Sequence, residues 1–198
     1  MSAVEPAALE ALYAEGDDPW GFRTSPYEAA KFAATAAALP RPRYRSALEL
    51  GCGNGELARR IAPRCARYTG LDAVDTALEA ARRAVPEGRF VQGFLPCPLP
   101  PGEHDLIVLS EVIYFLDAWG IDRLAEEIDR LWPTADVVIV TWRGPSGNAL
   151  EGEAALALFL AAVEAPRQVA TVRLEDRYRI EVLRCAEPVA APLPLTAE

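Results

Sequence analysis

Short apolar runs alternate along the chain with longer segments whose apolar residues recur every three or four positions. The short runs predict buried strands, and the longer segments predict amphipathic helices. Because strands that alternate with helices build a parallel, doubly wound α/β sheet, we expect that fold class. The predicted strands are 47–50, 68–71, 89–92, 105–109 and 136–141, the helices are 75–84, 121–131 and 150–163, and 169–174 with 178–183 form a terminal antiparallel hairpin.

An N-terminal segment precedes the sheet. Residues 3–15 and a stretch from Ser25 to about Leu39 are each expected to be helical, and a turn-rich stretch, 16–22, joins them. We expect this segment to be a helical lid that is mobile until the cofactor binds. The whole chain, 1–198, is expected to be one domain, with a cap at 1–42, an α/β core at 45–186 and a loose tail at 187–198.

The first predicted strand runs into a glycine-rich turn, 51–55, and a helical pattern follows from Glu56. A strand, a glycine turn and a helix in this order are typical of a nucleotide site, because glycines let a ligand approach the backbone. Compared with the dinucleotide pattern G-x-G-x-x-G, Gly55 comes one residue early. The Glu56 carboxylate would repel a pyrophosphate. The turn therefore favours a cationic ligand without phosphate, such as S-adenosylmethionine.

The segment from Glu49 to Gly55 resembles motif I of the class I methyltransferases, E-x-G-x-G-x-G. That resemblance implies a Rossmann-like, seven-stranded, mainly parallel sheet whose last strand inserts antiparallel. It also implies S-adenosyl-L-methionine as cofactor and S-adenosyl-L-homocysteine as product. The residues assigned to the cofactor in this turn are Glu49, Gly51, Cys52, Gly53 and Gly55.

Two later positions extend the predicted cofactor site. Asp72 ends the second strand, where an acid accepts the ribose hydroxyls in open α/β nucleotide sites; the alternative is a helix-capping aspartate. Ala73 would line the adenosine. Phe94 follows the third strand, where many class I methyltransferases have an aspartate. Either Phe94 stacks on adenine or the Leu95 backbone makes the contact, and a plain core phenylalanine is the alternative.

The stretch 110–116, Ser-Glu-Val-Ile-Tyr-Phe-Leu, directly follows the fourth strand. Ligands bind at the carboxyl ends of such strands, so these side chains are expected to face the cleft. Glu111 is expected to take a proton from the acceptor, to orient it, or to hold its cation, and Tyr114 shares its face. The alternative for Glu111 is a helix-capping carboxylate. Ser110 is assigned to the cofactor.

Four segments together are similar to the nodulation protein S family: 17–20, 25–28, 48–52 and 110–116. Members are bacterial N-methyltransferases that act on the freed amine of the non-reducing glucosamine in a chitooligosaccharide. The resemblance therefore implies a small-molecule or oligosaccharide acceptor.

The same resemblance assigns further residues. It implies that Trp20, which has no partner nearby in sequence, covers the cofactor and that Lys31 pairs with the cofactor carboxylate. A hydrophobic staple is the alternative for Trp20. Tyr27, Arg143 and Asn148 fall on the acceptor side. The family has a histidine where Asn148 stands, which implies a different acceptor.

Charge and composition exclude several classes of partner. The net charge of −9 and the pI near 4.8 argue against nucleic acid and against an anionic membrane surface. Four scattered cysteines and one histidine suggest neither a metal site nor a disulfide framework, and they fit a cytoplasmic protein. The N-terminus lacks a basic and then apolar signal pattern. Oligomeric state is left open.

Three rival functions remain open on the sequence. One is an O-methyltransferase of natural-product or glycan biosynthesis. A second is a cofactor-binding module without turnover. The third is a nicotinamide oxidoreductase, which Glu56 disfavours.

Overall fold

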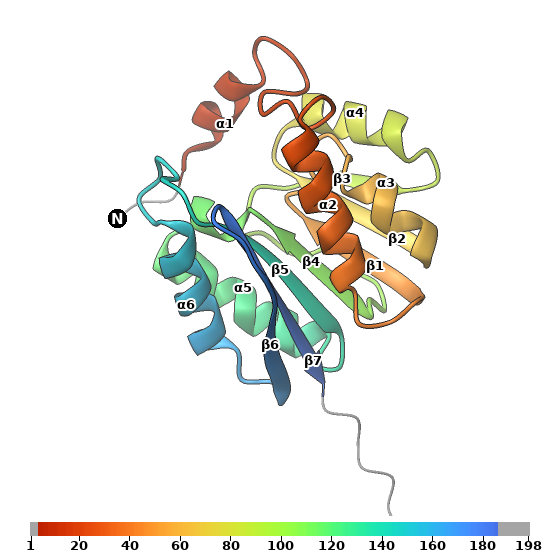
Figure 1. Cartoon of the computed structure of the whole chain (residues 1–198), viewed down its shortest axis with the longest axis vertical. Coiled ribbons are helices and arrows are strands. Elements are labelled where there is room, and N and C mark those ends of the chain that lie inside the picture. Colours follow the sequence, from red (N-terminus) through yellow and green to blue (C-terminus); the bar gives the residue numbers. More distant parts are fainter. Residues whose placement is uncertain (1–3, 186–198) are drawn as a thin grey trace, which may run out of the picture.

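The computed structural model, which describes residues 4–185, is built on a seven-stranded sheet with helices on both faces (Figure 1). The strand order is β3-β2-β1-β4-β5-β7-β6. Strands β1 to β5 pair in parallel, and β7 pairs antiparallel with both β5 and β6. The predicted α/β sheet with an antiparallel last strand is confirmed. The strands are β1 (Tyr44–Leu50), β2 (Cys65–Asp72), β3 (Arg89–Gln92), β4 (Leu106–Ser110), β5 (Asp136–Trp142), β6 (Arg167–Leu174) and β7 (Tyr178–Cys185).

Two layers of helices cover the sheet. Helices α2, α3 and α4 pack on one face, and α5 and α6 pack on the other. Successive residues of β1 point to opposite faces of the sheet. Ala47 therefore packs in the core under α2, α3 and α4, and Leu48 packs in the core under α5 and α6. The helices are α1 (Pro6–Leu12), α2 (Pro26–Ala38), α3 (Ala58–Ile61), α4 (Asp75–Ala84), α5 (Ala118–Leu131) and α6 (Gly152–Ala162), with 3₁₀ turns η1 (Ala62–Arg64) and η2 (Ile113–Phe115).

Helix α2 belongs to the core layer. Its start is as predicted, because the Ser25 hydroxyl accepts a hydrogen bond from the Glu28 amide at 3.3 Å and Pro26 occupies the first helical position. Phe32 and Thr35 are buried against the sheet. The mobility predicted for the segment to Ala38 stays a prediction, and the packing of α2 is a reason to narrow it. The lid expectation applies only to the part before α2.

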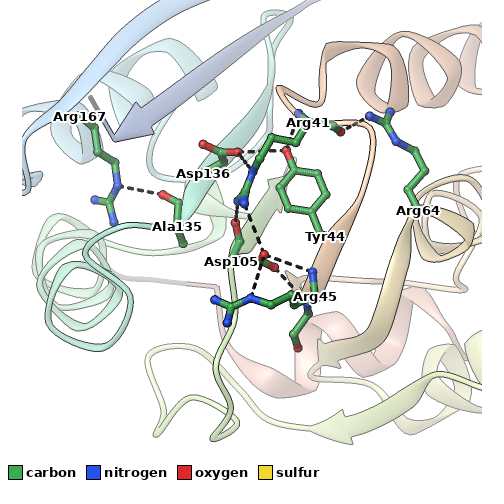
Figure 2. Close-up of polar contacts among 9 residues, drawn as sticks. Arg41, Tyr44, Arg45, Arg64, Asp105, Ala135, Asp136 and Arg167 are labelled. Carbon is green, nitrogen blue, oxygen red and sulfur yellow. Dashed lines mark hydrogen bonds and ion pairs between the residues drawn. The ribbon is translucent and has the colours of Figure 1, made fainter. Parts of the chain in front are cut away.

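A polar network at the amino-terminal ends of β1, β4 and β5 holds Arg41, near the end of the predicted cap at residue 42 (Figure 2). The Arg41 guanidinium donates hydrogen bonds to the Asp136 carboxylate at 2.9 Å and to the Asp105 carbonyl at 2.5 Å. The Tyr44 hydroxyl donates to Asp136 at 3.1 Å, and Arg64 donates to the Arg41 carbonyl. These contacts tie the segment after α2 to three strands, at the end of the sheet opposite to the carboxyl ends.

Several element boundaries differ from the predictions by a few residues, and two of the differences have a clear local cause. The helix expected from Glu56 begins at Ala58 and passes into a 3₁₀ turn after Ile61, because Pro63 lacks the amide that another α-turn needs. Helix α5 begins three residues earlier than predicted, because the Asp117 carboxylate accepts the Gly120 amide at 2.8 Å and caps it. The loose tail predicted at 187–198 lies outside the described residues.

Across residues 4–185, none of the helices has the length and apolarity that crossing a membrane requires. The same part of the chain contains no cluster of three or more histidine, cysteine or acidic side chains able to hold a metal ion.

Candidate active site

A cavity of about 420 Å³ lies at the carboxyl ends of β1, β2 and β4, with the N-terminal segment over it. Most of the predicted site residues come together in its lining: Trp20, Lys31, Glu49, Gly51, Cys52, Gly53, Asp72, Ala73, Phe94, Leu95, Ser110, Glu111 and Tyr114. Four others do not line it: Tyr27, Gly55, Arg143 and Asn148.

The glycine turn forms one wall of the cavity. Gly51 has φ 75°, and a Cβ there would lie 2.7 Å from the Val112 side chain, so no other residue fits without displacing β4's end. Gly53 also has a positive φ, 51°, but the nearest side-chain atom to its would-be Cβ is 3.6 Å away, on Phe22. Gly55 instead packs on Ala81 of α4. Gly55 thus has a role in helix packing, and its predicted contact with the cofactor stays a prediction.

Two acids, the buried Glu49 and the partly buried Asp72, stand on neighbouring strands beside this turn. The Asp72 carboxylate accepts hydrogen bonds from the Gly53 amide at 2.8 Å and the Val74 amide at 3.1 Å. Burial raises the pKa of Asp72, although these bonds oppose the rise. Glu49 accepts a hydrogen bond from the Tyr68 hydroxyl, and burial, with the Asp72 charge, raises the pKa of Glu49 well above its ordinary value. Glu49 therefore supports the turn, and Asp72 is the anionic group at the cavity.

Glu111 has a backbone conformation that is unusual for its residue type. It has φ 55°, and among the described non-glycine residues it alone has a positive φ. Such a conformation costs of the order of 1–3 kcal/mol and is found mostly at functional sites. The Glu111 amide donates to the Val140 carbonyl at 2.8 Å, which fixes the turn after β4. Burial raises the pKa of Glu111, and the Lys31 charge only partly offsets the rise.

Lys31, the chain's single lysine, is held by protein carboxylates. Its side chain is 2% exposed, and its ammonium lies 2.8 Å from Glu28 Oε2 and also pairs with Glu111. The structure thus gives Lys31 two acidic partners from the protein itself. Its predicted pairing with a cofactor carboxylate stays a prediction.

Tyr114 lies beside this acid–lysine group. Its side chain is buried, and burial together with the charges of Glu111 and Glu28 raises its pKa, so it is a neutral phenol at neutral pH. Its ring stacks on Phe115 with centroids 5.1 Å apart. No described residue forms a hydrogen bond with its hydroxyl, which leaves that group available to a ligand.

Aromatic side chains of the N-terminal segment cover the glycine turn. Trp20 stacks on Phe22 with ring centroids 5.5 Å apart and meets Tyr13 edge-on at 5.5 Å. Phe22 in turn meets Phe32 of α2 at 5.5 Å. The expectation that Trp20 lacks a partner nearby in sequence is therefore wrong, since Phe22 stands two residues on. Trp20 is still 43% exposed at the cavity edge.

A hydrogen bond joins this aromatic cover to the glycine turn. The Asp18 carboxylate accepts the Asn54 side-chain amide at 2.9 Å and the Phe22 backbone amide at 2.7 Å. Asp17 adds an ion pair to Arg83 of α4 at 2.8 Å. The segment before α2 is thus attached to the core by these polar contacts and by apolar packing, with Tyr13 against Val74 and Ala77 and Phe22 against Phe32.

The predicted acceptor-side residues lie just beyond the cavity. Tyr27 packs under the Arg177 guanidinium at 3.7 Å, and burial raises its pKa to about 12. Arg143 pairs with Glu153 at 2.7 Å, and the Asn148 backbone amide donates to Ser146 Oγ at 3.1 Å. The lining on this side comes from neighbouring residues of the same loop: Trp142, which the family resemblance also places on the acceptor side, and Pro145 and Ser146, which were not predicted.

Several other lining residues were missed. Glu28 lies within the segment 25–28 that resembles the nodulation protein S family, and Phe22 lies two residues after the segment 17–20. Their places in or near these segments could have identified them. Leu9 and Tyr13 carry no local pattern that marks them, because only the fold brings them over the cavity.

Comparison with known proteins identifies the family. A methyltransferase-domain model matches residues 47–133, which run from β1 to just after α5 and include the glycine turn, Asp72 and Glu111. A presumed methyltransferase of known structure from Pseudomonas syringae is 35% identical, with a TM-score of 0.67 over 79% of this chain and 97% of that one. The chain belongs to the class I S-adenosylmethionine-dependent methyltransferases. The predicted family, fold and cofactor are confirmed.

Other relatives of this methyltransferase bear out the particular resemblance. Nodulation protein S of Rhizobium tropici is 33% identical over 117 residues, which is 55% of this chain and 48% of that protein. The N-methyltransferase NodS of Bradyrhizobium japonicum WM9, solved with S-adenosyl-L-homocysteine, is 22% identical with a TM-score of 0.75 over 91% of this chain and 98% of that one, which shows a shared fold. The methyltransferase spans about half the length of the first curated relatives it matches.

The residues of the cavity fit the cofactor of this family. Its volume is within the range of small-molecule sites. A carboxylate at Asp72 suits ribose hydroxyls, and the backbone at Gly53 is open to close approach. Phe94 and the aromatic cover offer apolar surface for an adenine ring, and the acids at the other end suit a sulfonium.

Proposed function

We propose that this methyltransferase transfers a methyl group to the amine of a small acceptor, with an amino sugar of the chitooligosaccharide type as first candidate. The observation that supports the proposal is Glu111. It is a largely buried carboxylate, 15% exposed, with a raised pKa, in a strained conformation, at the strand end that faces the cavity. A base in that position serves an acceptor that must lose a proton, whether an ammonium or a hydroxyl. The similarity to the N-methyltransferase NodS favours the amine.

The chain's own residues divide the work. When bound, S-adenosylmethionine supplies an electrophilic methyl group on a sulfonium. Asp72 accepts hydrogen bonds from the ribose hydroxyls, and the aromatic cover with Trp20 excludes water. Glu111 accepts the proton from the acceptor amine, which attacks only when it carries a lone pair. Tyr114 donates or accepts one hydrogen bond that orients the acceptor. Holding the two reacting atoms aligned and dry accounts for much of the expected acceleration.

A methyl-transfer assay with labelled S-adenosylmethionine tests this function. The acceptors are a chitotetraose freed of one acetyl group, the fully acetylated chitotetraose, and catechol as a hydroxyl acceptor. We expect label on the free amine and none on the acetylated sugar. Label on catechol instead would favour the O-methyltransferase alternative. Binding of S-adenosyl-L-homocysteine by calorimetry without label on any acceptor would favour a cofactor-binding module.

A further inference from the structure

Three charged side chains meet at one end of the cavity. Glu28 and Lys31 come from α2, and Glu111 comes from the end of β4. The Lys31 ammonium lies between the two carboxylates, 2.8 Å from Glu28 and in direct contact with Glu111. The side chains are 12%, 2% and 15% exposed, in the order Glu28, Lys31, Glu111. With both acids ionised, the group carries one negative charge in excess.

No other cation of the described chain lines the cavity to neutralise that charge. Lys31 is the only basic residue in the lining, which also contains the acids Glu49 and Asp72 at the cofactor end. The Arg177 guanidinium is stacked on the Tyr27 ring at 3.7 Å and lies outside the lining. An uncompensated charge away from water is costly, and a ligand that brings the missing positive charge relieves that cost.

Polar groups around the trio are also left without partners. Glu28 Oε2 accepts no hydrogen bond, although Lys31 Nζ lies 2.8 Å away, so this contact is an ion pair with poor hydrogen-bond geometry. The Tyr27 hydroxyl is buried and unbonded. Tyr114, more than nine-tenths buried and part of the lining, has no hydrogen-bond partner for its hydroxyl within the described chain. Buried polar groups usually have partners. Glu28 and Tyr114 belong to the cavity lining whereas Tyr27 does not, so the first two point to a ligand with hydrogen-bond donors.

We propose that Glu28 is a specificity-determining residue, which acts with Lys31 and Glu111 to select an acceptor that enters the site as an ammonium ion. The inference rests on the proposed function and assigns to one residue the preference for an amine over an amide or an alcohol. Lys31 keeps both carboxylates in place and leaves one charge for the ligand. The Tyr114 hydroxyl accepts one ammonium hydrogen, and the Glu28 carboxylate accepts another.

Binding measurements without turnover test this selection. Titration calorimetry at pH 7 on the complex with S-adenosyl-L-homocysteine compares two amine and acetamide pairs: glucosamine with N-acetylglucosamine, and the singly deacetylated chitotetraose with chitotetraose. We expect the wild-type protein to prefer the amine by about 10-fold or more, as expected for one charge-assisted contact. Glu28→Gln should remove most of that preference, and Glu28→Asp should retain it. Glu79→Gln, the same change at an exposed position of α4, should have no effect.

Each outcome decides. A wild-type protein without amine preference, including one that binds neither member of a pair, overturns the inference. So does a preference that survives both Glu28→Gln and Glu28→Ala, the second variant serving if the first does not fold. Methylation of amines with selectivity unchanged in Glu28→Gln would leave the proposed function standing and remove this inference. If the amine preference is lost in Glu28→Gln but the wild-type protein methylates no acceptor, this inference stands and the proposed function is overturned.

Discussion

Glu111 combines a strained backbone conformation with a largely buried carboxylate whose charge the Lys31 ammonium partly neutralises. The positive φ turns the chain out of β4, and the side chain contacts Lys31 at the cavity wall. The apolar surroundings raise the pKa, which makes the group a better proton acceptor than an exposed glutamate. A purely structural role would not require either cost.

Replacing Glu111 with glutamine tests its role as base. Shape and hydrogen bonding are largely retained, while charge and basicity are lost, so we expect kcat to fall about 10²-fold with little change in cofactor binding. In the wild-type protein, kcat should rise with pH as Glu111 loses its proton, with an inflection above the ordinary value of 4.5. That limb should vanish in Glu111→Gln. Wild-type turnover in the variant at every pH would show that Glu111 is structural.

Asp72→Ala should weaken the cofactor. Loss of a charged acceptor for two ribose hydroxyls costs about 1.5–3 kcal/mol, which is roughly 10- to 100-fold in affinity. Calorimetric titration with S-adenosyl-L-homocysteine measures the change. Asp75→Asn, an exposed acid three residues on, is the control and should bind normally. Unchanged affinity in a folded Asp72→Ala protein would exclude the ribose contact.

For individual residues, the sequence predicted which ones lie at the cavity but not which residues they contact. The glycine turn, Asp72 and Glu111 follow strands, and the carboxyl ends of parallel strands meet at one edge of a sheet. Lys31 and Glu111 stand far apart in the chain, and only the packing of α2 brings them together. The same holds for Tyr13 over the glycine turn. Tertiary contacts of this kind leave no local pattern.

Among the elements, the contrast between α2 and the segment before it has the clearest consequence. Helix α2 buries Phe32 against the sheet, whereas α1 has no buried residue. The link between them depends on Asp17, Asp18 and an aromatic cluster. Elements with few buried contacts open locally at low cost. The lid is therefore expected to end near Ser25.

Limited proteolysis tests that boundary. Trypsin should cut after Arg23 in the free protein, and saturating S-adenosyl-L-homocysteine should slow this cut, because a ligand that binds the closed form protects it by mass action. Cleavage after the exposed Arg173 of β6 should not change. Trp20 fluorescence should also respond to the ligand, and the response should be lost in Trp20→Phe. Equal rates at Arg23 with and without ligand would make the segment a fixed layer.

Most elements were predictable because their signals are local. Apolar runs marked the central strands, and the Ser25-Pro26 pair marked the start of α2. The errors have local causes as well: Pro63 shortens the helix after the glycine turn, and Asp117 starts α5 early. The position of β7 between β5 and β6 was available only through the resemblance, since the alternating pattern of a hairpin does not state which strand pairs with the sheet.

For the whole molecule, the network at the opposite end of the sheet should contribute to stability. Burial raises the pKa of Asp105, but amide hydrogen bonds from Ser46 at 2.9 Å and Arg45 at 3.1 Å, with the charge of Arg41, lower it overall below 3.8. A lowered folded-state pKa gives stability that is complete above about pH 5 and is lost as the pH falls through that pKa.

Asp105→Asn should therefore reduce the free energy of unfolding at pH 7 by about 1.5–3 kcal/mol, the usual loss for hydrogen bonds to a charged group. The difference from wild type should shrink as the pH falls below 4. Urea unfolding at several pH values measures both, with Asp75→Asn as an exposed control. A constant difference between the two proteins across this range would contradict the ionised role of Asp105.

The central claim is that the cavity at the carboxyl ends of β1, β2 and β4 binds S-adenosylmethionine with its reactive end toward Glu111. A crystal structure of the complex with S-adenosyl-L-homocysteine tests it most directly. We predict the ribose hydroxyls on the Asp72 carboxylate, the adenine against Phe94, and the sulfur on the side of Glu111 and Tyr114. A ligand with its ribose away from Asp72, or with its sulfur pointing away from Glu111, would contradict the account.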